Sequence, residues 1–186
     1  PDPGTVAPSV DPTVATTVAA ATRFLYTGPN PIQTAVAEGT IEPKRTAVIR
    51  GRVLKRTDSP LTGVVITILN HPEFGQTLSR SDGRFDMAVN GGGFLTVRYQ
   101  KEGYLSAQRT INVPWQDYVP LPDVVLIPVD EQATTVVMDA GAMQVARGRM
   151  ETDLDGARQA TILFPAGTNA QMTLPDGSVQ PLTDMT

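Results

Sequence analysis

The sequence predicts an all-β protein whose central part is an antiparallel β-sandwich. Residues 47–128 contain about seven short alternating or apolar segments, and turn residues separate them. Helical periodicity is almost absent along the whole chain. Short strands at regular spacing with turns between them are typical of an antiparallel sandwich. We therefore divide the chain into an arm at residues 1–46, the sandwich at residues 47–128, and a second, small or truncated β domain at residues 129–186.

The arm is expected to be extended and irregular. Its first part, PDPGTVAPSVDPTVATTVAAAT, is rich in Pro, Ala, Thr and Val and shows no clean alternation. The only helix-like string, TTVAAATRFL, lacks a convincing amphipathic stripe. Residues 23–46 add four large side chains among Pro and Gly, which are the candidate docking residues Phe24, Leu25, Tyr26 and Ile32.

These four anchors are too few to fold the arm by themselves. Burying a large apolar side chain contributes roughly 1.5–3 kcal/mol, while fixing one backbone residue costs about 1–2 kcal/mol. Over the arm, the cost of fixing the backbone far exceeds what four side chains contribute. We therefore expect RFLYTGPNPI to dock on the sandwich or on another part of the parent protein, with the Pro-rich stretch before it as an extended tether.

The strand pattern begins at Ala47. AVIRGRVLKR alternates, and TGVVITILN is β-branched and largely apolar, as in a strand that is covered on much of its surface. The later expected strands are FGQTLSRS, GRFDMAV, GFLTVRYQK, YLSAQRTINV and DVVLIPV, with VPWQDYVPL expected as a Pro-rich aromatic loop. Alternation sends Phe85 inward and Arg84, Asp86 and Ala88 to the opposite face. The predicted core consists of Val64, Ile66, Ile68, Phe85, Met87, Val89, Leu95 and Val97.

The last part of the chain, after Pro128, shows a second set of short strands. The segments are TTVVMD, MQVARGRMETD, RQATILFP, AQMTLPDG and SVQPLT. Asp155-Gly156 and Asp176-Gly177 lie between alternating stretches, which predicts hairpins at both positions.

Composition limits the function classes. The chain has 186 residues, no cysteine, a single histidine and a formal net charge of −4. The sequence has no stripe of basic residues, so a nucleic-acid partner is not expected. It also has no apolar run long enough to span a bilayer. Disulfides, thiol catalysis and multi-histidine metal sites are excluded. Because the chain begins at Pro1 without an initiator Met or signal peptide, we expect a fragment of a longer protein.

The glycine run Gly91-Gly92-Gly93 is weighed as a phosphate-binding loop or a hairpin bend. A phosphate loop needs a lysine, a hydroxyl and a helix after its glycines, but the strand-like FLTV follows here. We therefore predict a hairpin bend whose residues need positive φ. Ser81-Asp82-Gly83 is predicted to be a turn on the same grounds, rather than the site of a catalytic Asp82.

Two further candidates for chemistry are interpreted as structural. Asp153 and Asp155, with Asp139 or Glu151, could hold calcium, but the spacing of an EF-hand loop is missing, so a hairpin turn is favoured. His71 in NHPEFG has no serine in a nucleophile motif beside it, so a surface or packing role is favoured. No catalytic, cofactor-binding or metal-binding residue and no cofactor is predicted.

Trp115 and Tyr118 complete the candidate interaction residues. An aromatic pair in a Pro-rich loop suits an interface with a neighbouring domain or a ligand site. The alternative is a lid over one end of the sandwich core.

GRVLKRTDSPLTGVVITILN and SRSDGRFDMAVNGGGFLTVRYQKEGYLSAQRTINV together resemble the carboxypeptidase regulatory-like domain, a transthyretin-like β-sandwich. The matching positions are Gly51, Val53, Pro60, Leu61, Gly63, Val64, Asp82, Gly83, Phe85, Lys101, Gly103 and Tyr104. The resemblance covers about residues 47–128 and implies the fold. It implies little about function, because the module is an accessory in many proteins.

The flanking segments RFLYTGPNPIQT, TILNHPEFGQT and VPWQDYVPLPDVVLIP resemble the region ahead of the repeats in bacterial RHS/YD-repeat proteins, whose animal relatives are the teneurins. In that family the repeats build a hollow β-shell around a toxin. The resemblance implies a non-catalytic module that packs on or plugs the shell and couples it to delivery. Its partners would be the rest of the parent protein and a secretion or delivery component. It would be secreted, or injected by a bacterial delivery system.

The alternative function is a carbohydrate- or surface-binding accessory sandwich of a secreted protein. Coplanar exposed aromatics would favour it, but aromatic residues make up only 5% of the chain, and Trp115 is the sole tryptophan. An enzyme is disfavoured, because the sequence offers no nucleophile–base pair and no set of metal ligands.

Overall fold

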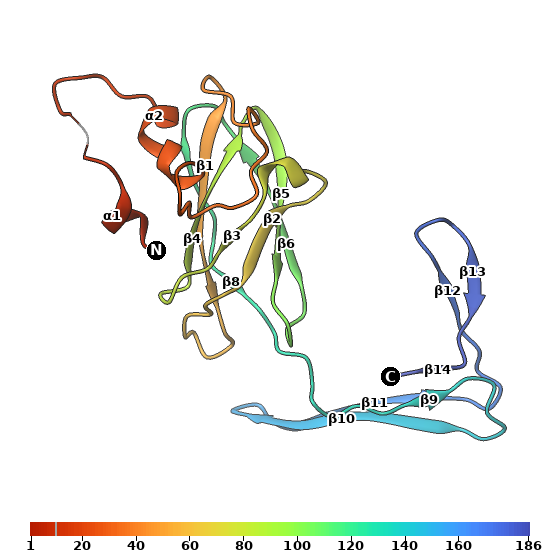
Figure 1. Cartoon of the computed structure of the whole chain (residues 1–186). Coiled ribbons are helices and arrows are strands. Elements are labelled where there is room, and N and C mark those ends of the chain that lie inside the picture. The colour runs from red at the N-terminus through yellow and green to blue at the C-terminus, as the bar shows by residue number, and fades with distance from the viewer. Residues whose placement is uncertain (10) are drawn as a thin grey trace. The chain divides into compact units, whose positions relative to one another are not determined.

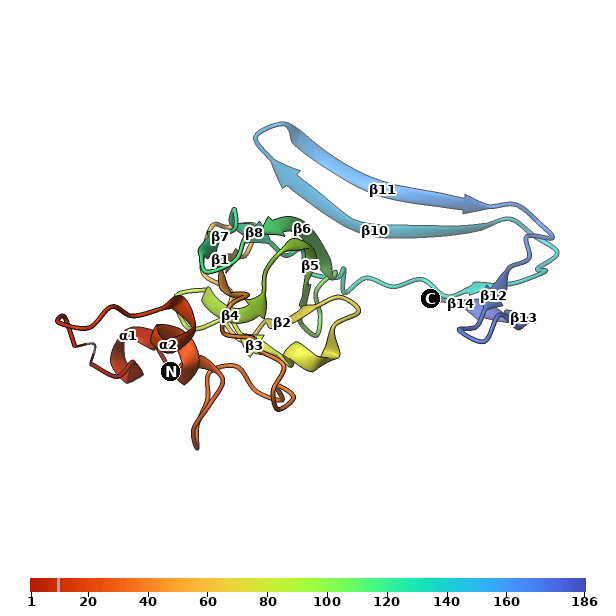
Figure 2. The same cartoon turned by 90° about the horizontal axis from the view of Figure 1, so that it is seen from above.

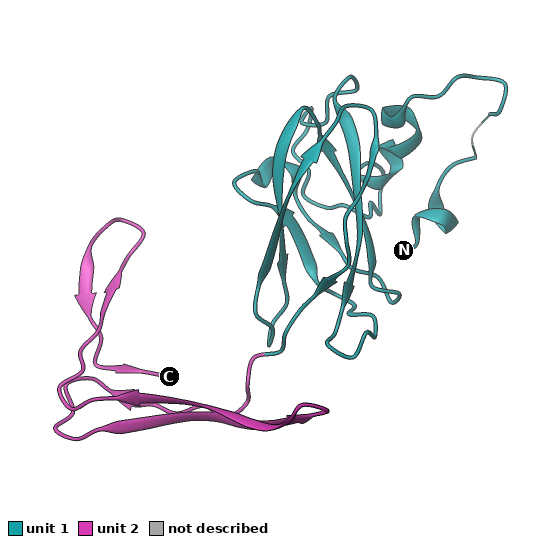
Figure 3. Cartoon of the chain, turned by 180° about the vertical axis from the view of Figure 1, so that it is seen from behind, with its two compact units in different colours: residues 1–128 teal, residues 129–186 magenta. Residues whose placement is uncertain are grey.

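The computed structural model describes residues 1–9 and 11–186, and it divides into two compact units. Unit 1 covers residues 1–128 and unit 2 covers residues 129–186 (Figure 3). The extended backbone expected at Val10 lies outside the described residues. Unit 1 contains the arm and the sandwich.

The arm contains short helices, so the expectation of a wholly extended segment is wrong. They are α1 (Pro3–Val6), α2 (Val18–Thr22) and the 3-10 helix η1 (Arg23–Leu25). Thr17 caps α2 through a hydrogen bond from Ala20 N to its hydroxyl, 3.2 Å long. The alanines have high helix propensity, and tertiary packing stabilises a helix too short to show a stripe in the sequence.

The sandwich consists of two four-stranded sheets (Figures 1 and 2). The first sheet contains β4 (Arg84–Asn90), β1 (Thr46–Leu54), β7 (Tyr118–Pro120) and β8 (Val124–Val125). The second has the order β3 (Thr77–Leu78), β2 (Val65–Ile68), β5 (Gly93–Gln100) and β6 (Ala107–Val113), with the 3-10 helix η2 (Pro72–Phe74) after β2. The all-β sandwich class is therefore confirmed.

Two details of the predicted strands need correction. β7 lies within VPWQDYVPL, which was expected to be a loop, so the sandwich has one strand more than predicted. β7 and β8 both pair with β1 in parallel, so the first sheet is mixed. Val48 N donates to Asp117 O at 2.9 Å, and Leu121 N donates to Arg50 O at 2.7 Å. Pro120 is tolerated because a proline at a sheet edge leaves no ladder bond unmade.

The core lies between the two sheets. All eight predicted core residues are buried there, and the most exposed of them, Leu95, is only 9% exposed. This confirms the predicted core. The rings of Phe85 and Tyr99 meet edge to face, with centroids 5.8 Å apart. Gly51 faces Phe85 across the β1–β4 ladder, and a Cβ at Gly51 would overlap the Phe85 ring.

The opposite face of β4 is also covered, which alternation alone did not predict. Asp86 is 4% exposed and Ala88 is 0% exposed, although both were assigned to the face away from the core. A period of two gives the face of a residue but not what covers that face. Here the arm and two arginines cover it.

The glycine run is a turn, as predicted, but it does not close a hairpin. β4 belongs to the first sheet and β5 to the second, so residues 91–92 carry the chain from one sheet to the other. Gly92 has φ +105°, and a Cβ there would overlap the Trp115 ring. A Cβ at Gly91 would overlap Pro114 O. Glycine is therefore needed here for close approach of the loop that carries Trp115.

Unit 2 is built from three strand pairs. β10 (Gln144–Asp153) pairs with β11 (Gly156–Phe164), β12 (Gln171–Thr173) with β13 (Val179–Pro181), and β9 (Val136–Val137) with β14 (Asp184–Met185). The hairpins predicted at Asp155-Gly156 and Asp176-Gly177 are confirmed. Among the described residues of this unit, Val136 is the only buried apolar side chain.

Tyr99 provides a test of the core. Its ring is fully buried, and its hydroxyl has no hydrogen-bond partner among the described residues. A buried unsatisfied polar group costs about 1–3 kcal/mol, so Tyr99→Phe is expected to raise the free energy of unfolding by about 1 kcal/mol at neutral pH. Urea unfolding of both proteins measures the difference, and a destabilised Tyr99→Phe protein would contradict it.

The same residue makes stability depend on alkaline pH. Burial raises the pKa of Tyr99 far above its ordinary value, because the phenolate loses its hydration. The folded state therefore favours the protonated form. The stabilisation that Tyr99 gives by staying protonated is complete below its pKa in the unfolded chain, about 10. This stabilisation is lost as pH rises from there toward the higher pKa of Tyr99 in the folded state. Tyr99→Phe should remove most of this loss. The remainder belongs to Tyr26, whose pKa burial also raises.

Candidate functional site

Within unit 1, the arm packs against the sandwich beside strands of the first sheet. α2 packs near β1, and η1 packs near β4. Leu25 is 2% exposed, whereas Phe24, Tyr26 and Ile32 are half-buried. Of the four candidate anchors, one is thus fully covered within this chain. The other three retain surface that another body could contact.

Gln33 connects the arm to β4 of the first sheet and to η2, which follows β2 of the second sheet, and it was not identified from the sequence. Its side chain is completely buried. Its amide Nε2 donates to Phe74 O at 2.8 Å and to Ala88 O at 2.9 Å, and its Oε1 accepts from Ala88 N at 2.7 Å. The amide thus pairs with Ala88 on β4 in the way that a neighbouring strand would. A lone glutamine in a Pro-rich stretch gives no sequence signal of such a role.

The backbone after Gln33 forms hydrogen bonds with the segment between β2 and β3 of the second sheet. Thr34 N donates to Gln76 O at 2.8 Å, and Gln76 N donates back to Thr34 O at 2.9 Å. Ala37 N donates to Glu73 O at 2.9 Å. Gly75 has φ +62°, and a Cβ there would overlap the backbone of Thr34 and Ala35. The segment after Ile32 therefore lies closely against the η2 loop.

Trp115 and Tyr118 do not form one aromatic surface with the arm. Trp115 is 57% exposed and lies over the Gly92 turn. Tyr118 is 38% exposed, and the Arg50 guanidinium lies 4.4 Å from its ring centroid in a cation–π contact. The loop is held by a hydrogen bond from Gln116 N to Thr46 O, 2.9 Å long.

The two residues considered as catalytic candidates, His71 and Asp82, form hydrogen bonds with residues close in sequence. His71 Nδ1 lies 2.8 Å from Glu73 Oε1, and this contact lowers the pKa of the Glu73 carboxyl. Asp82 Oδ1 accepts from Arg84 N at 2.9 Å, and Gly83 has φ +78°, so Asp82 lies in a turn as predicted.

The proposed calcium ligands lie in unit 2 and contact neighbouring groups. Asp153 pairs with Arg158, and Glu151 pairs with Arg149, whose Nε lies 2.7 Å from Glu151 Oε1. Asp155 N donates to Asp153 Oδ1 within the hairpin turn. No group of three or more His, Asp or Glu side chains that could hold a metal occurs in residues 1–9 and 11–186.

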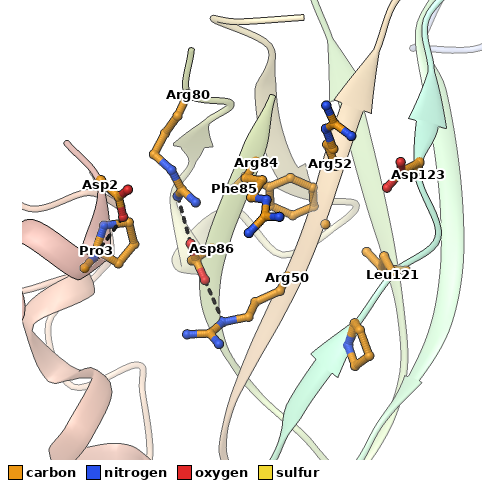
Figure 4. Close-up of a pocket in the computed structure, with 13 residues that line it drawn as sticks. Asp2, Pro3, Arg50, Arg52, Arg80, Arg84, Phe85, Asp86, Leu121 and Asp123 are labelled. Atoms are coloured by element: carbon orange, nitrogen blue, oxygen red, sulfur yellow. Dashed lines mark hydrogen bonds and ion pairs between the residues drawn. The ribbon is translucent and has the colours of Figure 1, made fainter. Parts of the chain in front are cut away.

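An ion cluster occupies the outer face of the first sheet. Asp86 lies between two arginines: Arg50 Nε is 2.7 Å from Asp86 Oδ1, and Arg80 Nη1 is 2.8 Å from Asp86 Oδ2. Figure 4 shows both pairs beside Arg84 and Arg52. The sequence offered no signal for this cluster beyond the alternation of charged residues on β1 and β4.

The exposed apolar side chains of unit 2 form the largest unexplained feature. On β10 and β11, Met150 is 64% exposed, Ile162 is 60% exposed and Leu163 is 57% exposed. Leu154 at the tip of the hairpin is fully exposed. The β10–β11 hairpin therefore leaves these apolar side chains uncovered within the described residues. Within the part of the chain that the structure describes, no helix could span a membrane.

Comparison with known proteins identifies the domain type in unit 1. Residues 41–126 match the model of the Teneurin TTR-like domain. The chain is 32% identical over 100 residues to Teneurin-3 of Danio rerio, which covers 54% of this chain and 4% of that protein. It is 38% identical over 87 residues to Teneurin-1 of Gallus gallus (47% and 3%) and 37% identical over 97 residues to Teneurin-m of Drosophila melanogaster (52% and 4%).

Two facts follow from these matches. Residues 41–126 of unit 1 are similar to the Teneurin TTR-like domain, which agrees with the TTR-like β-sandwich described above. The matched stretch spans only 3–4% of the length of these curated relatives, which are therefore very large proteins.

Solved structures give weaker matches. A 3-chlorocatechol 1,2-dioxygenase from Rhodococcus opacus 1CP has a TM-score of 0.38 and 13% identity, covering 47% of this chain and 62% of that one. A cohesin–X-dockerin complex from Acetivibrio cellulolyticus has a TM-score of 0.38 and 16% identity, covering 46% of this chain and 60% of that one. We draw no functional conclusion from either.

Proposed function

We propose that this chain is a non-catalytic structural module of a large RHS-type toxin protein. Unit 1 packs on or plugs the β-shell that encloses the toxin, and unit 2 adds its strands to that shell. Coupling to a secretion or delivery component and a secreted or injected location belong to the same proposal. The TTR-like match and the size of the relatives support a module within a large protein.

The observation that carries this proposal is the missing core of unit 2. Two-stranded ribbons are marginally stable in water unless further strands or another element cover a face. β10 and β11 are long strands whose apolar side chains lie mostly exposed. We infer that a sheet of the parent protein covers them. A shell of β-repeats has both the strand edges and the apolar surface to do so.

The alternative, a carbohydrate-binding accessory domain, needs aromatic faces that are free for stacking on a sugar. Trp115 offers one such face. The Arg50 guanidinium already lies over the ring of Tyr118. The aromatic pair therefore offers a poorer platform than its sequence suggested, and we favour the structural role.

Amide hydrogen exchange of the 186-residue chain and of the complete parent protein tests the structural role. Residues 144–164 should exchange quickly in the chain alone and slowly in the parent, because burial of the hairpin in the shell protects its amides. β1 and β4 of unit 1 are the internal control and should be protected in both. Rapid exchange of residues 144–164 in the parent would overturn the proposal.

A further inference from the structure

A pocket of about 600 Å³ lies on the outer face of the β1–β4 ladder and includes the ion cluster around Asp86. Four arginines line it: Arg50 and Arg52 from β1, Arg84 from β4, and Arg80 from the turn before β4. Figure 4 shows these side chains together, with Asp2 and Pro3 of the arm at one side and Asp123 at the other. We call this site the arginine pocket.

Three carboxylates line the pocket with the four arginines, those of Asp2, Asp86 and Asp123, and Asp82 lies beside Arg80 and Arg84. The buried Asp86 is shared between Arg50 and Arg80. Arg80 Nε is buried without a hydrogen bond, 3.9 Å from Asp82 Oδ1. Asp2 accepts a bond from Gly4 N, where it caps α1. Asp86 therefore holds two arginines in position while leaving their charge only partly compensated.

Arg52 and Arg84 form the open part of the pocket. They are directly opposite each other in the antiparallel register, where like charges are destabilising. Both rely on the half-exposed Asp82: Arg52 Nε donates to its carbonyl oxygen at 3.2 Å, and Arg84 Nε lies 3.9 Å from its Oδ2. An anion between the two guanidinium groups would remove this repulsion and receive paired N–H donors.

We propose that the arginine pocket binds a glutamate or aspartate side chain in an acidic peptide segment of a partner protein. Arg52 and Arg84 hold the carboxylate, and the Asp86-linked pair Arg50 and Arg80 supplies the positive surroundings. Planar carboxylates and guanidinium forks match in geometry, which makes arginine the residue suited to this recognition.

Two observations favour a peptide over a nucleic acid. A polypeptide segment already runs along the pocket wall, since Asp2, Pro3 and Gly4 line it and Pro1 and Asp2 border an adjoining hollow of about 360 Å³. The chain as a whole carries a net charge of −4, which opposes the approach of a polyphosphate backbone. Within the pocket, Arg52 and Arg84 share only the half-exposed Asp82, which suits a single carboxylate of a short acidic segment.

Fluorescence anisotropy with a labelled hexaglutamate peptide and the 186-residue chain tests the proposal. We expect binding that weakens as salt is added, because exposed charges are screened. The double variant Arg52→Gln/Arg84→Gln should bind about tenfold more weakly or worse. The Arg84 side chain is 69% exposed, so this variant should remain folded, which thermal unfolding verifies.

Arg109→Gln is the matched control for each single change, Arg52→Gln and Arg84→Gln, because Arg109 is an exposed arginine on β6 of the other sheet and its substitution removes the same one charge. It should bind the peptide like the unchanged chain. Three results would overturn the proposal. They are no binding at millimolar protein, equal weakening by Arg109→Gln, and tighter binding of inorganic phosphate or a single-stranded oligothymidylate than of the peptide.

Discussion

Phe85→Ala is expected to lower the free energy of unfolding of unit 1 by about 3–5 kcal/mol, because it removes a fully enclosed ring and leaves a cavity. Phe85 is 1% exposed and lies at the centre of the core, edge to face with Tyr99. It also covers Gly51, where the opposite strand has no side chain of its own. The change therefore removes contacts to both sheets at once.

Urea unfolding followed by Trp115 fluorescence measures this loss. Trp115 is the only tryptophan in the sequence and lies in unit 1, so its signal reports that unit. The matched control is Phe94→Ala on β5, since Phe94 is 76% exposed. A surface substitution of this kind usually changes stability by less than about 0.5 kcal/mol. Similar losses for the two variants would show that burial of Phe85 is not the cause.

The core could be predicted because alternation reports which side chains share a face. Phe85, Met87 and Val89 follow the period of two, and one slip in register would move them all outward. Turn residues were equally informative: Asp82-Gly83 and both Asp-Gly pairs of unit 2 lie in turns as expected. These signals are local, so a single sequence carries them.

Pairing partners could not be predicted, because alternation is the same whichever strand lies alongside. The glycine run was interpreted as a hairpin bend, yet β4 and β5 belong to different sheets. β7 was missed because a three-residue edge strand among prolines carries almost no pattern, and its pairing with β1 is a long-range event.

The arginine pocket and the arm contacts lay beyond the sequence for the same reason. Asp86 looked like an ordinary outward residue, and only the fold brings Arg80 to its Oδ2. Gln33 looked like a loop residue, but it contacts residues 41 and 55 positions away. Trp115 and Tyr118 were recognised by type, although Arg50 at the Tyr118 ring was not.

Gln33→Ala should lower the free energy of unfolding of unit 1 by about 3 kcal/mol or more, because each buried group left without a partner costs about 1–3 kcal/mol. The substitution leaves the carbonyl oxygens of Phe74 and Ala88 and the backbone amide of Ala88 without their hydrogen-bond partner. The backbone bond from Gln33 N to Leu25 O, 2.8 Å long, remains possible in the variant, but the segment that carries it loses its side-chain attachment to β4 and η2. We therefore expect faster amide exchange at residues 23–35 as well as lower stability.

Gln33→Leu separates the lost hydrogen bonds from the lost volume. Leucine fills most of the space but offers no polar group, so the buried backbone groups of Phe74 and Ala88 remain unpaired and most of the destabilisation should persist. Gln108→Ala on β6 is the control, because Gln108 is exposed and its loss should be almost neutral. Urea unfolding of the three variants decides between the two causes. If Gln33→Leu were as stable as the unchanged chain, the Gln33 side chain would contribute through packing alone, and its amide would not act in place of a neighbouring strand on β4.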